Sequence, residues 1–303
     1  MAVLIHSFET DSGIHCLAVT KNDRIITGSR DGKITTWDFK KRKALHSFHS
    51  QHRHLDSLAV TADNRMIISG GSGELKVWNL KNRSLEKEIK TYVDDANVLL
   101  TTPGGKCISG HEYGGLLVWD ITEGKRIKTL DREEIWVFSR IMADPDGITA
   151  AAITPDGGTL ITGTYYGSLY FWNLKTYERF HSFPGHTTWI TGIVLLPDLQ
   201  HGMSVAFDGS VKTWNLNNPE SANTTFQGKA AFHAIALLAD SRHVVWGTED
   251  GLLFTWDSKQ KKITDSFKAH SNQINAAALL KNGLLLTVSE DKTLKAWDMK
   301  KTA

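Results

Sequence analysis

Cysteine and proline are both scarce in this sequence, which has two cysteines and six prolines among 303 residues. The two cysteines, Cys16 and Cys107, are too few for a disulfide framework, and isolated thiols are typical of a reducing compartment. The low proline content, with no Ser/Pro-rich or Gln-rich stretch, argues against a long disordered linker. We therefore expect a cytoplasmic protein whose fold needs no disulfide.

Long apolar runs and a dominant charge are also missing. No segment approaches the roughly 18 consecutive apolar residues that a membrane-spanning helix needs. The opening residues, MAVLIHSFETD, have none of the features of a signal peptide. The 35 basic residues nearly balance the 33 acidic ones, whereas proteins that neutralise nucleic-acid phosphates usually carry a strong basic excess. We expect neither a membrane protein nor a general nucleic-acid binder.

Tryptophan, by contrast, is abundant: seven of the ten tryptophans are followed by Asp or Asn. These dipeptides begin at Trp37, Trp78, Trp119, Trp172, Trp214, Trp256 and Trp297. Their spacings are 41, 41, 53, 42, 42 and 41 residues, and a four-stranded propeller blade takes roughly 40–45 residues. A tight turn and alternating side chains precede each Trp, as in SRDGKITTWD (29–38), and a further short strand follows, as in ALHSF (44–48). The pattern predicts four short strands per repeat.

The two ends of the sequence predict how the ring closes. The last repeat stops just after Trp297-Asp298 and lacks its fourth strand, while VLIHSF (3–8) has the character of that strand. We therefore predict an all-β, seven-bladed β-propeller in a single domain (1–303), closed when the N-terminal strand completes the last blade, because closure removes open sheet edges. The predicted blades span 13–48, 54–89, 95–130, 147–183, 189–226, 231–267, and 273–298 with 3–8.

The repeats resemble the WD-repeat family over nearly the whole chain. In that family a hydrogen-bonded tetrad links the Trp indole through a hydroxyl to a His and an Asp. The tetrad looks complete in blade 5 (His186, Ser204, Asp208, Trp214) and in blade 7 (His270, Thr287, Asp291, Trp297). Blade 1 keeps Thr27, Asp31 and Trp37 but has no matching His. Other departures are Ser72, Tyr113 and Tyr166 in place of the Asp of blades 2, 3 and 4, and Trp246 in place of the blade 6 hydroxyl.

The recurring Ser, His and Asp residues also suggest a hydrolase triad, but a triad would occur once, whereas these sets recur beside a Trp. We interpret Ser204 and Thr287 as framework residues. The histidines of HSFHSQHRH (46–54) lack the cysteine pair, HExxH motif or carboxylates of a metal site, so we interpret this segment as a polar connection between blades 1 and 2. We expect a non-catalytic protein with no metal and no cofactor; an enzyme site at the channel mouth is the remote alternative.

The resemblance also implies a partner-binding face. In the family this face gathers the residue before the tetrad Asp and the residues three and five after the tetrad His. In blade 5 these positions hold Phe207, Trp189 and Thr191, and blade 4 adds Tyr165. Tyr165, Trp189 and Phe207 would form an aromatic cluster, and such residues are enriched at interface hot spots. The alternative is that these side chains pack against each other or under a loop.

The extra residues between blades 3 and 4 lie within 131–147 and carry Trp136 and Phe138. This insertion either caps the channel mouth or docks a partner. Acidic residues occupy further face positions: Asp95, Glu112, Glu249 and Glu290.

We therefore predict a scaffold, alone or within a larger protein or complex, whose acidic, aromatic face binds a basic protein or peptide through Tyr165, Trp189, Phe207, Trp136, Phe138, Glu249 and Glu290. The alternative is that the basic turns of blades 6, 7 and 1 bind an anionic surface, either nucleic acid or lipid headgroups; these turns carry Lys40, Lys41, Arg42, Lys43, Lys259, Lys261, Lys262, Lys300 and Lys301.

Overall fold

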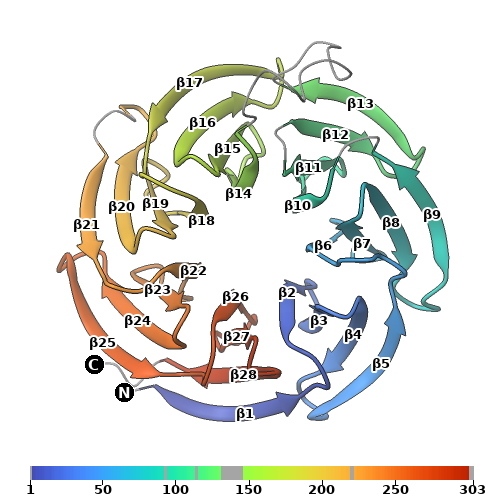
Figure 1. Ribbon diagram of the computed structural model, residues 1–303, viewed down its shortest axis with the longest axis horizontal. Coiled ribbons are helices and arrows are strands. Elements are labelled where there is room, and N and C mark those ends of the chain that lie inside the picture. The colour runs from blue at the N-terminus through green and yellow to red at the C-terminus, as the bar shows by residue number, and fades with distance from the viewer. Residues whose placement is uncertain (1, 92–93, 113–114, 131–145, 219–221, 300–303) are drawn as a thin grey trace.

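Seven small antiparallel sheets stand around a common centre in this protein (Figure 1). The computed structural model describes residues 2–91, 94–112, 115–130, 146–218 and 222–299, and over these ranges it contains strands but no helix. Each sheet has four strands, which we name a to d from the centre outward. The fold is the predicted all-β propeller with seven blades.

The strands are short, as the spacing of the turn residues predicts. In blades 1 to 3, in the order a to d, they are β2 (Ile14–Val19), β3 (Arg24–Ser29), β4 (Lys33–Asp38), β5 (Lys43–His49); β6 (Ser57–Val60), β7 (Met66–Gly71), β8 (Glu74–Asn79), β9 (Leu85–Lys90); β10 (Ala96–Thr101), β11 (Cys107–His111), β12 (Leu116–Asp120) and β13 (Lys125–Leu130).

The remaining blades follow the same order. Their strands are β14 (Ile148–Ile153), β15 (Thr159–Thr164), β16 (Ser168–Asn173), β17 (Glu178–Pro184); β18 (Ile190–Leu195), β19 (His201–Ala206), β20 (Ser210–Asn215), β21 (Asn223–Gln227); β22 (Phe232–Leu237), β23 (His243–Thr248), β24 (Leu252–Asp257), β25 (Lys262–Lys268); and β26 (Ile274–Leu279), β27 (Leu285–Ser289), β28 (Thr293–Asp298) with β1 (Val3–Glu9).

The predicted closure by the N-terminal strand is confirmed. β1 pairs antiparallel with β28, in a register that places Val3 opposite Asp298 and Glu9 opposite Thr293. In Figure 1, β1 lies at the rim of the ring outside β28. Phe8 is buried in this strand, and its ring centroid lies 5.1 Å from that of Trp37 in blade 1. The N-terminal strand therefore completes blade 7 and contributes to the packing against blade 1.

The core lies between the blades rather than in one central mass. Strands b and c alternate their side chains toward the two neighbouring blades, so each junction between adjacent sheets has its own buried cluster. At the junction of blades 7 and 1, for example, Leu286 and Leu294 pack with Ile25 and Trp37. The two cysteines are unpaired and buried in such clusters. Each blade is thus stabilised by both of its neighbours.

The antiparallel order of the strands gives the ring two chemically distinct faces. One face carries the d-to-a connections and the b–c turns, and we call it the DA face. The other carries the a–b and c–d turns, and we call it the CD face. Every residue just before a strand a, or just after a strand b, therefore lies on the DA face, whatever its blade.

A set of side chains near the start of the inner strands joins neighbouring blades. Each donates a hydrogen bond to a backbone carbonyl of the next inner strand, as Thr149 does to Ile190 O (2.6 Å) and Asn275 to Ile14 O (2.8 Å). The other members are Ser57, Asn97 and Thr191. These bonds hold the inner strands in register around the channel and so position the side chains of the DA face.

Candidate functional site

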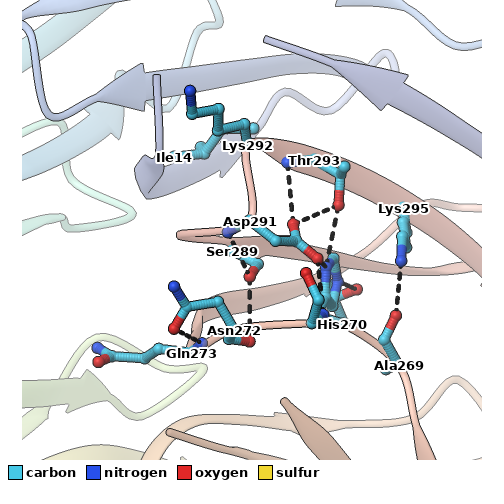
Figure 2. A network of polar contacts seen from close by, with 12 residues as sticks. Ile14, Ala269, His270, Asn272, Gln273, Ser289, Asp291, Lys292, Thr293 and Lys295 are labelled. Atoms are coloured by element: carbon cyan, nitrogen blue, oxygen red, sulfur yellow. Dashed lines mark hydrogen bonds and ion pairs between the residues drawn. The ribbon is translucent and has the colours of Figure 1, made fainter. Parts of the chain in front are cut away.

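Blade 7 contains a complete tetrad, and Figure 2 shows the part of it around His270 and Asp291. The indole N–H of Trp297 donates to Thr287 Oγ1 at 2.9 Å, and that hydroxyl lies 2.7 Å from His270 Nε2. On the other side of the ring, His270 Nδ1 lies 2.9 Å from Asp291 Oδ2, and Thr293 also bonds to Asp291 (2.6 Å). Burial lowers the pKa of His270 to about 4, so the imidazole is neutral at pH 7, with Nδ1–H donating to Asp291 and Nε2 accepting from Thr287.

Blade 5 builds its tetrad in a similar way, with Ser210 at the position that Thr293 holds in blade 7. Ser204 Oγ accepts from the Trp214 indole (3.2 Å) and bonds to His186 Nε2 (2.7 Å). On the other side of the imidazole, Nδ1 lies 2.6 Å from Ser210 Oγ, which in turn donates to Asp208 (2.5 Å), while the direct distance between His186 and Asp208 is 3.7 Å. The connection from His to Asp therefore runs mainly through Ser210, a residue that the sequence pattern does not single out.

One histidine of the polar connection between blades 1 and 2 has a structural role that the sequence analysis did not assign. His52 is buried, and its Nε2 lies 2.9 Å from Ser69 Oγ, the hydroxyl that accepts from the Trp78 indole (2.9 Å). His52 is therefore the tetrad histidine of blade 2. Ser72, which replaces the Asp, accepts the backbone N–H groups of Arg53 and His54 at 3.1 and 3.2 Å. The signal in the sequence is the spacing of 17 residues between His52 and Ser69, which matches the spacing from His270 to Thr287.

Blades 3 and 4 replace tetrad members with residues from other positions. In blade 3, His111 comes two residues after Ser109 on the same strand, and its Nε2 lies 2.9 Å from the Ser109 hydroxyl that receives the blade's Trp indole. In blade 4, Asp146 from the connection before β14 accepts the backbone N–H of Tyr166 (2.8 Å). In both blades a nearby residue outside the usual tetrad position therefore supplies a polar group that the pattern lacks. Tyr113 lies outside the described residues.

Blade 6 departs furthest from the pattern. Trp246 occupies the hydroxyl position, and the indole nitrogens of Trp246 and Trp256 are both buried with no hydrogen-bond partner among the described residues. An aromatic cluster replaces the polar chain: Trp246 stacks on Phe254 at 6.1 Å and approaches Phe226 at 5.9 Å. At the position of the tetrad Asp, Asp250 accepts a hydrogen bond from the Thr248 hydroxyl.

The Ser and Thr hydroxyls of these tetrads are framework groups. Ser204 and Thr287 are fully buried, and each hydroxyl is held between an indole N–H and an imidazole nitrogen. A nucleophile must reach its substrate, and neither hydroxyl contacts solvent. Within the ranges that the structure describes, no group of three or more His, Cys, Asp or Glu side chains is placed to hold a metal ion.

The DA face brings the three predicted aromatic residues together. The ring centroids of Tyr165 and Trp189 lie 4.2 Å apart, and those of Trp189 and Phe207 lie 5.5 Å apart. The row continues to Tyr166 beside Tyr165 (5.4 Å) and to His233 beside Phe207 (5.7 Å). The three side chains pack against one another while 38–45% of each remains exposed, and their role in partner binding stays a prediction. We call Tyr165, Trp189 and Phe207 the aromatic row.

A polar chain extends from the aromatic row across blade 7. His233 Nδ1 lies 3.2 Å from the Gln273 side chain, which donates to Asn275 (2.8 Å), and Asn275 donates to Glu290 (2.9 Å). His15 of blade 1 lies 3.8 Å from the same Glu290 carboxylate. Hydrogen bonding to His15 keeps the pKa of Glu290 below its usual value, so this predicted site residue is charged at neutral pH.

Carboxylates gather on the DA face of blades 2 and 3. Burial and the neighbouring Asp95 raise the pKa of Asp56 to about 6, and burial followed by Asp95 raises the pKa of Glu112 as well. One oxygen of Asp56, Oδ2, is buried with no hydrogen-bond donor among the described residues. Asp56 is a face residue that the sequence analysis missed, because it stands four residues after His52, whereas the family's face positions stand three and five residues after the tetrad His. The crowding of these groups makes this part of the face strongly electronegative.

The remaining predicted site residues are placed as follows. Glu249 lies on the DA face of blade 6, where its carboxylate is 3.5 Å from the backbone nitrogen of Ala231. Trp136 and Phe138 of the insertion lie outside the described residues. The basic turns of the alternative hypothesis lie on the CD face, where these side chains are exposed: Lys40, Lys41, Arg42, Lys43, Lys259, Lys261 and Lys262. Lys300 and Lys301 also lie outside the described residues, and anionic-surface binding stays a prediction.

Comparison with known proteins agrees with this geometry. The family model described as "WD domain, G-beta repeat" matches five segments, at 2–38, 42–79, 136–173, 177–215 and 261–298, which together span more than half of the chain. No curated protein sequence matches significantly. The structure shows no helix long and apolar enough to cross a membrane within the described ranges. WD40 propellers are generally non-catalytic scaffolds that typically mediate protein–protein interaction. The repeat matches, the seven blades and the Trp-centred tetrads together show that the chain belongs to the WD40 family.

Proposed function

We propose that this propeller is a scaffold that binds a basic segment of a partner protein across its DA face. The observation that carries the proposal is the aromatic row, which is continuous over blades 4 and 5 and exposed on the same face as the carboxylates of blades 2, 3, 6 and 7. Contiguous exposed aromatic side chains on a soluble domain mark interaction surfaces more often than chance placement does.

The chemistry of the face selects the kind of partner. Aromatic ring faces attract a cation at close range and also accept the apolar stems of long side chains. The carboxylates of Asp56, Asp95 and Glu290 favour positive charge and disfavour negative charge on the same surface. Lysine and arginine combine an apolar stem with a charged end, so a segment containing them complements both halves of the face.

Trp189→Ala tests the aromatic row. Arrays of synthetic nonapeptides with randomised sequences identify binders of the wild-type protein, whose affinities are then measured by fluorescence anisotropy. We expect selected peptides to be rich in Lys or Arg and to bind the variant at least ~30-fold more weakly, equivalent to about 2 kcal/mol for an interface hot spot. Phe180→Ala is the matched control, because Phe180 is an exposed aromatic on the outer strand of blade 4. Equal loss in both variants, or no loss in either, would contradict the proposed site.

The raised pKa of Asp56 predicts that binding depends on pH. Burial, followed by the charge of Asp95, raises this pKa, and Glu112 adds to the rise, while His15 and His54 lower it, with a result of about 6. Below pH 6 the carboxyl becomes protonated and the face loses negative charge, so a basic peptide should bind several-fold more weakly at pH 5 than at pH 7.5. Asp56→Asn should weaken binding at pH 7.5 and flatten this pH response. A response equally steep in the variant would remove Asp56 from the binding surface.

A further inference from the structure

Six of the seven blades carry a large apolar residue two positions after the repeat Trp, and blade 6 does not. These residues are Phe39, Leu80, Ile121, Leu174, Leu216 and Met299. Each packs into or against the hydrophobic cluster that its blade shares with the preceding blade. In blade 6 the position holds Ser258, and the cluster between blades 5 and 6 has no equivalent member. We call the six apolar side chains the junction plugs.

A groove of about 890 Å³ lies where the plug of blade 6 is missing. It is on the CD face between blades 5 and 6, which are neighbours in the ring (Figure 1). Two grooves at junctions that have their plug are smaller: about 200 Å³ beside Phe39 and about 190 Å³ beside Leu174. A small hydroxymethyl group in place of a leucine-sized side chain leaves apolar surface uncovered. The volume of the blade 5–6 groove lies within the roughly 300–1,000 Å³ of ordinary ligand pockets.

The walls of the groove combine apolar surface with hydroxyl groups. Leu196 and Pro197 from the a–b turn of blade 5 face Trp256 of blade 6 across the groove, and Thr213 and Thr225 line it as well. The two threonine hydroxyls bond to each other at 2.6 Å. An apolar group entering the groove would therefore contact hydrocarbon and indole surface while the Thr213 and Thr225 hydroxyls stay bonded to each other.

The rim of the groove is positively charged. Lys259 and Lys261 line it from the c–d turn of blade 6, both are exposed, and neither side chain makes an ion pair with a described residue. The acidic residue at the rim, Asp198, is already engaged by the His201 ring at 2.6 Å and by the backbone N–H of Gln200. Asp198 keeps its negative charge in these contacts, so the described lining carries two ammonium groups against one carboxylate and is net positive.

We propose that this groove binds an acidic segment of a partner protein and that a leucine- or phenylalanine-sized side chain of that segment fills the place of the missing plug. The six other junctions show which side chains fit such a position, and the two lysines favour neighbouring Asp or Glu residues. The partner supplies in trans the contact that every other blade supplies from its own sequence. The site lies on the CD face and does not depend on the aromatic row.

Ser258→Leu tests the proposal by restoring the plug. The probe is a phage-displayed library of random nonapeptides, selected on the wild-type protein and counter-selected on the variant. We expect enriched peptides to carry a large apolar residue flanked by Asp or Glu, and to bind Ser258→Leu at least tenfold more weakly in fluorescence anisotropy. A thermal melt of the variant at or above the wild-type temperature shows that the loss of binding is not a loss of fold.

A second variant keeps the test decisive if Ser258→Leu folds poorly. The charge reversal Lys259→Glu with Lys261→Glu should weaken the same peptides at least tenfold, whereas Lys262→Ala, next to the groove but outside its lining, should leave them unchanged. Trp189→Ala should also have no effect, which separates this site from the DA face. Failure to enrich any peptide that distinguishes wild type from Ser258→Leu, or enrichment of basic peptides, would overturn the proposal. So would binding to phosphatidylserine vesicles that needs the two lysines but is unchanged in Ser258→Leu.

Discussion

Blades 6 and 7 are neighbours with the same four-stranded topology, yet they are held together in different ways. Blade 7 has a polar chain in which Trp297, Thr287, His270 and Asp291 satisfy one another's hydrogen-bonding groups. Blade 6 has an aromatic cluster around Trp246, and two of its buried indole N–H groups have no partner in the part of the chain that the structure describes. The comparison shows that the blade geometry does not require the tetrad, because aromatic burial supplies a stabilisation of another kind.

The two blades also differ in how they meet their preceding neighbours. Met299 of blade 7 is buried in the cluster shared with blade 6, whereas Ser258 of blade 6 leaves the groove beside blade 5 open. A paired polar chain fixes one side-chain arrangement because each unpaired alternative is costly, while aromatic contacts are less directional. The side chains of blade 6 are therefore held by less directional contacts, and the blade also borders an accessible groove. Both features fit a role in binding.

Deleting residues 3–9 should cause the largest loss of stability. Blade 7 depends on a strand from the other end of the chain, whereas blade 6 has its own outer strand. The truncated chain would expose β28 and lose Phe8 from the junction with blade 1. We expect a loss of at least ~3 kcal/mol, the cost of truncating one buried Phe alone, measured by urea unfolding. A synthetic peptide of residues 2–10 should restore stability. Leu4→Ser, at an exposed position of the same strand, is the control, and unchanged unfolding of the truncated chain would refute closure by β1.

The regular features of the fold could be predicted because they repeat. The Trp-Asp and Trp-Asn spacing determined the number of blades, and VLIHSF at 3–8 indicated the closing strand. The aromatic row was predictable because Tyr165, Trp189 and Phe207 stand at fixed offsets from residues of the repeat. Residues that take part in a tetrad from positions outside the repeat pattern could not be predicted in this way.

The missed features depend on contacts between residues that the repeat does not relate. His111 reaches the blade 3 hydroxyl from its own strand, and Ser210 stands between His186 and Asp208. Asp56 belongs to the acidic part of the face only because the fold brings the start of blade 2 beside Asp95. Ser258 is visible in the sequence as an exception, but its meaning depends on the size of the groove.

Thr287→Val and Trp246→Phe should separate the two modes of stabilisation, with the smaller effect in blade 6. Thr287→Val keeps the side-chain shape but leaves the Trp297 indole and His270 Nε2 without their shared partner, and each buried unpaired group costs about 1–3 kcal/mol. Trp246→Phe keeps an aromatic ring in the cluster and removes an N–H that has no partner among the described residues. The lost packing and the relieved polar group should therefore largely offset each other, within about 1 kcal/mol. Urea unfolding of the two variants and wild type measures both free energies. Equal destabilisation would mean that the Trp246 indole N–H contributes to blade 6 as the hydroxyl does to blade 7, and the distinction between a polar and an aromatic blade would then fail.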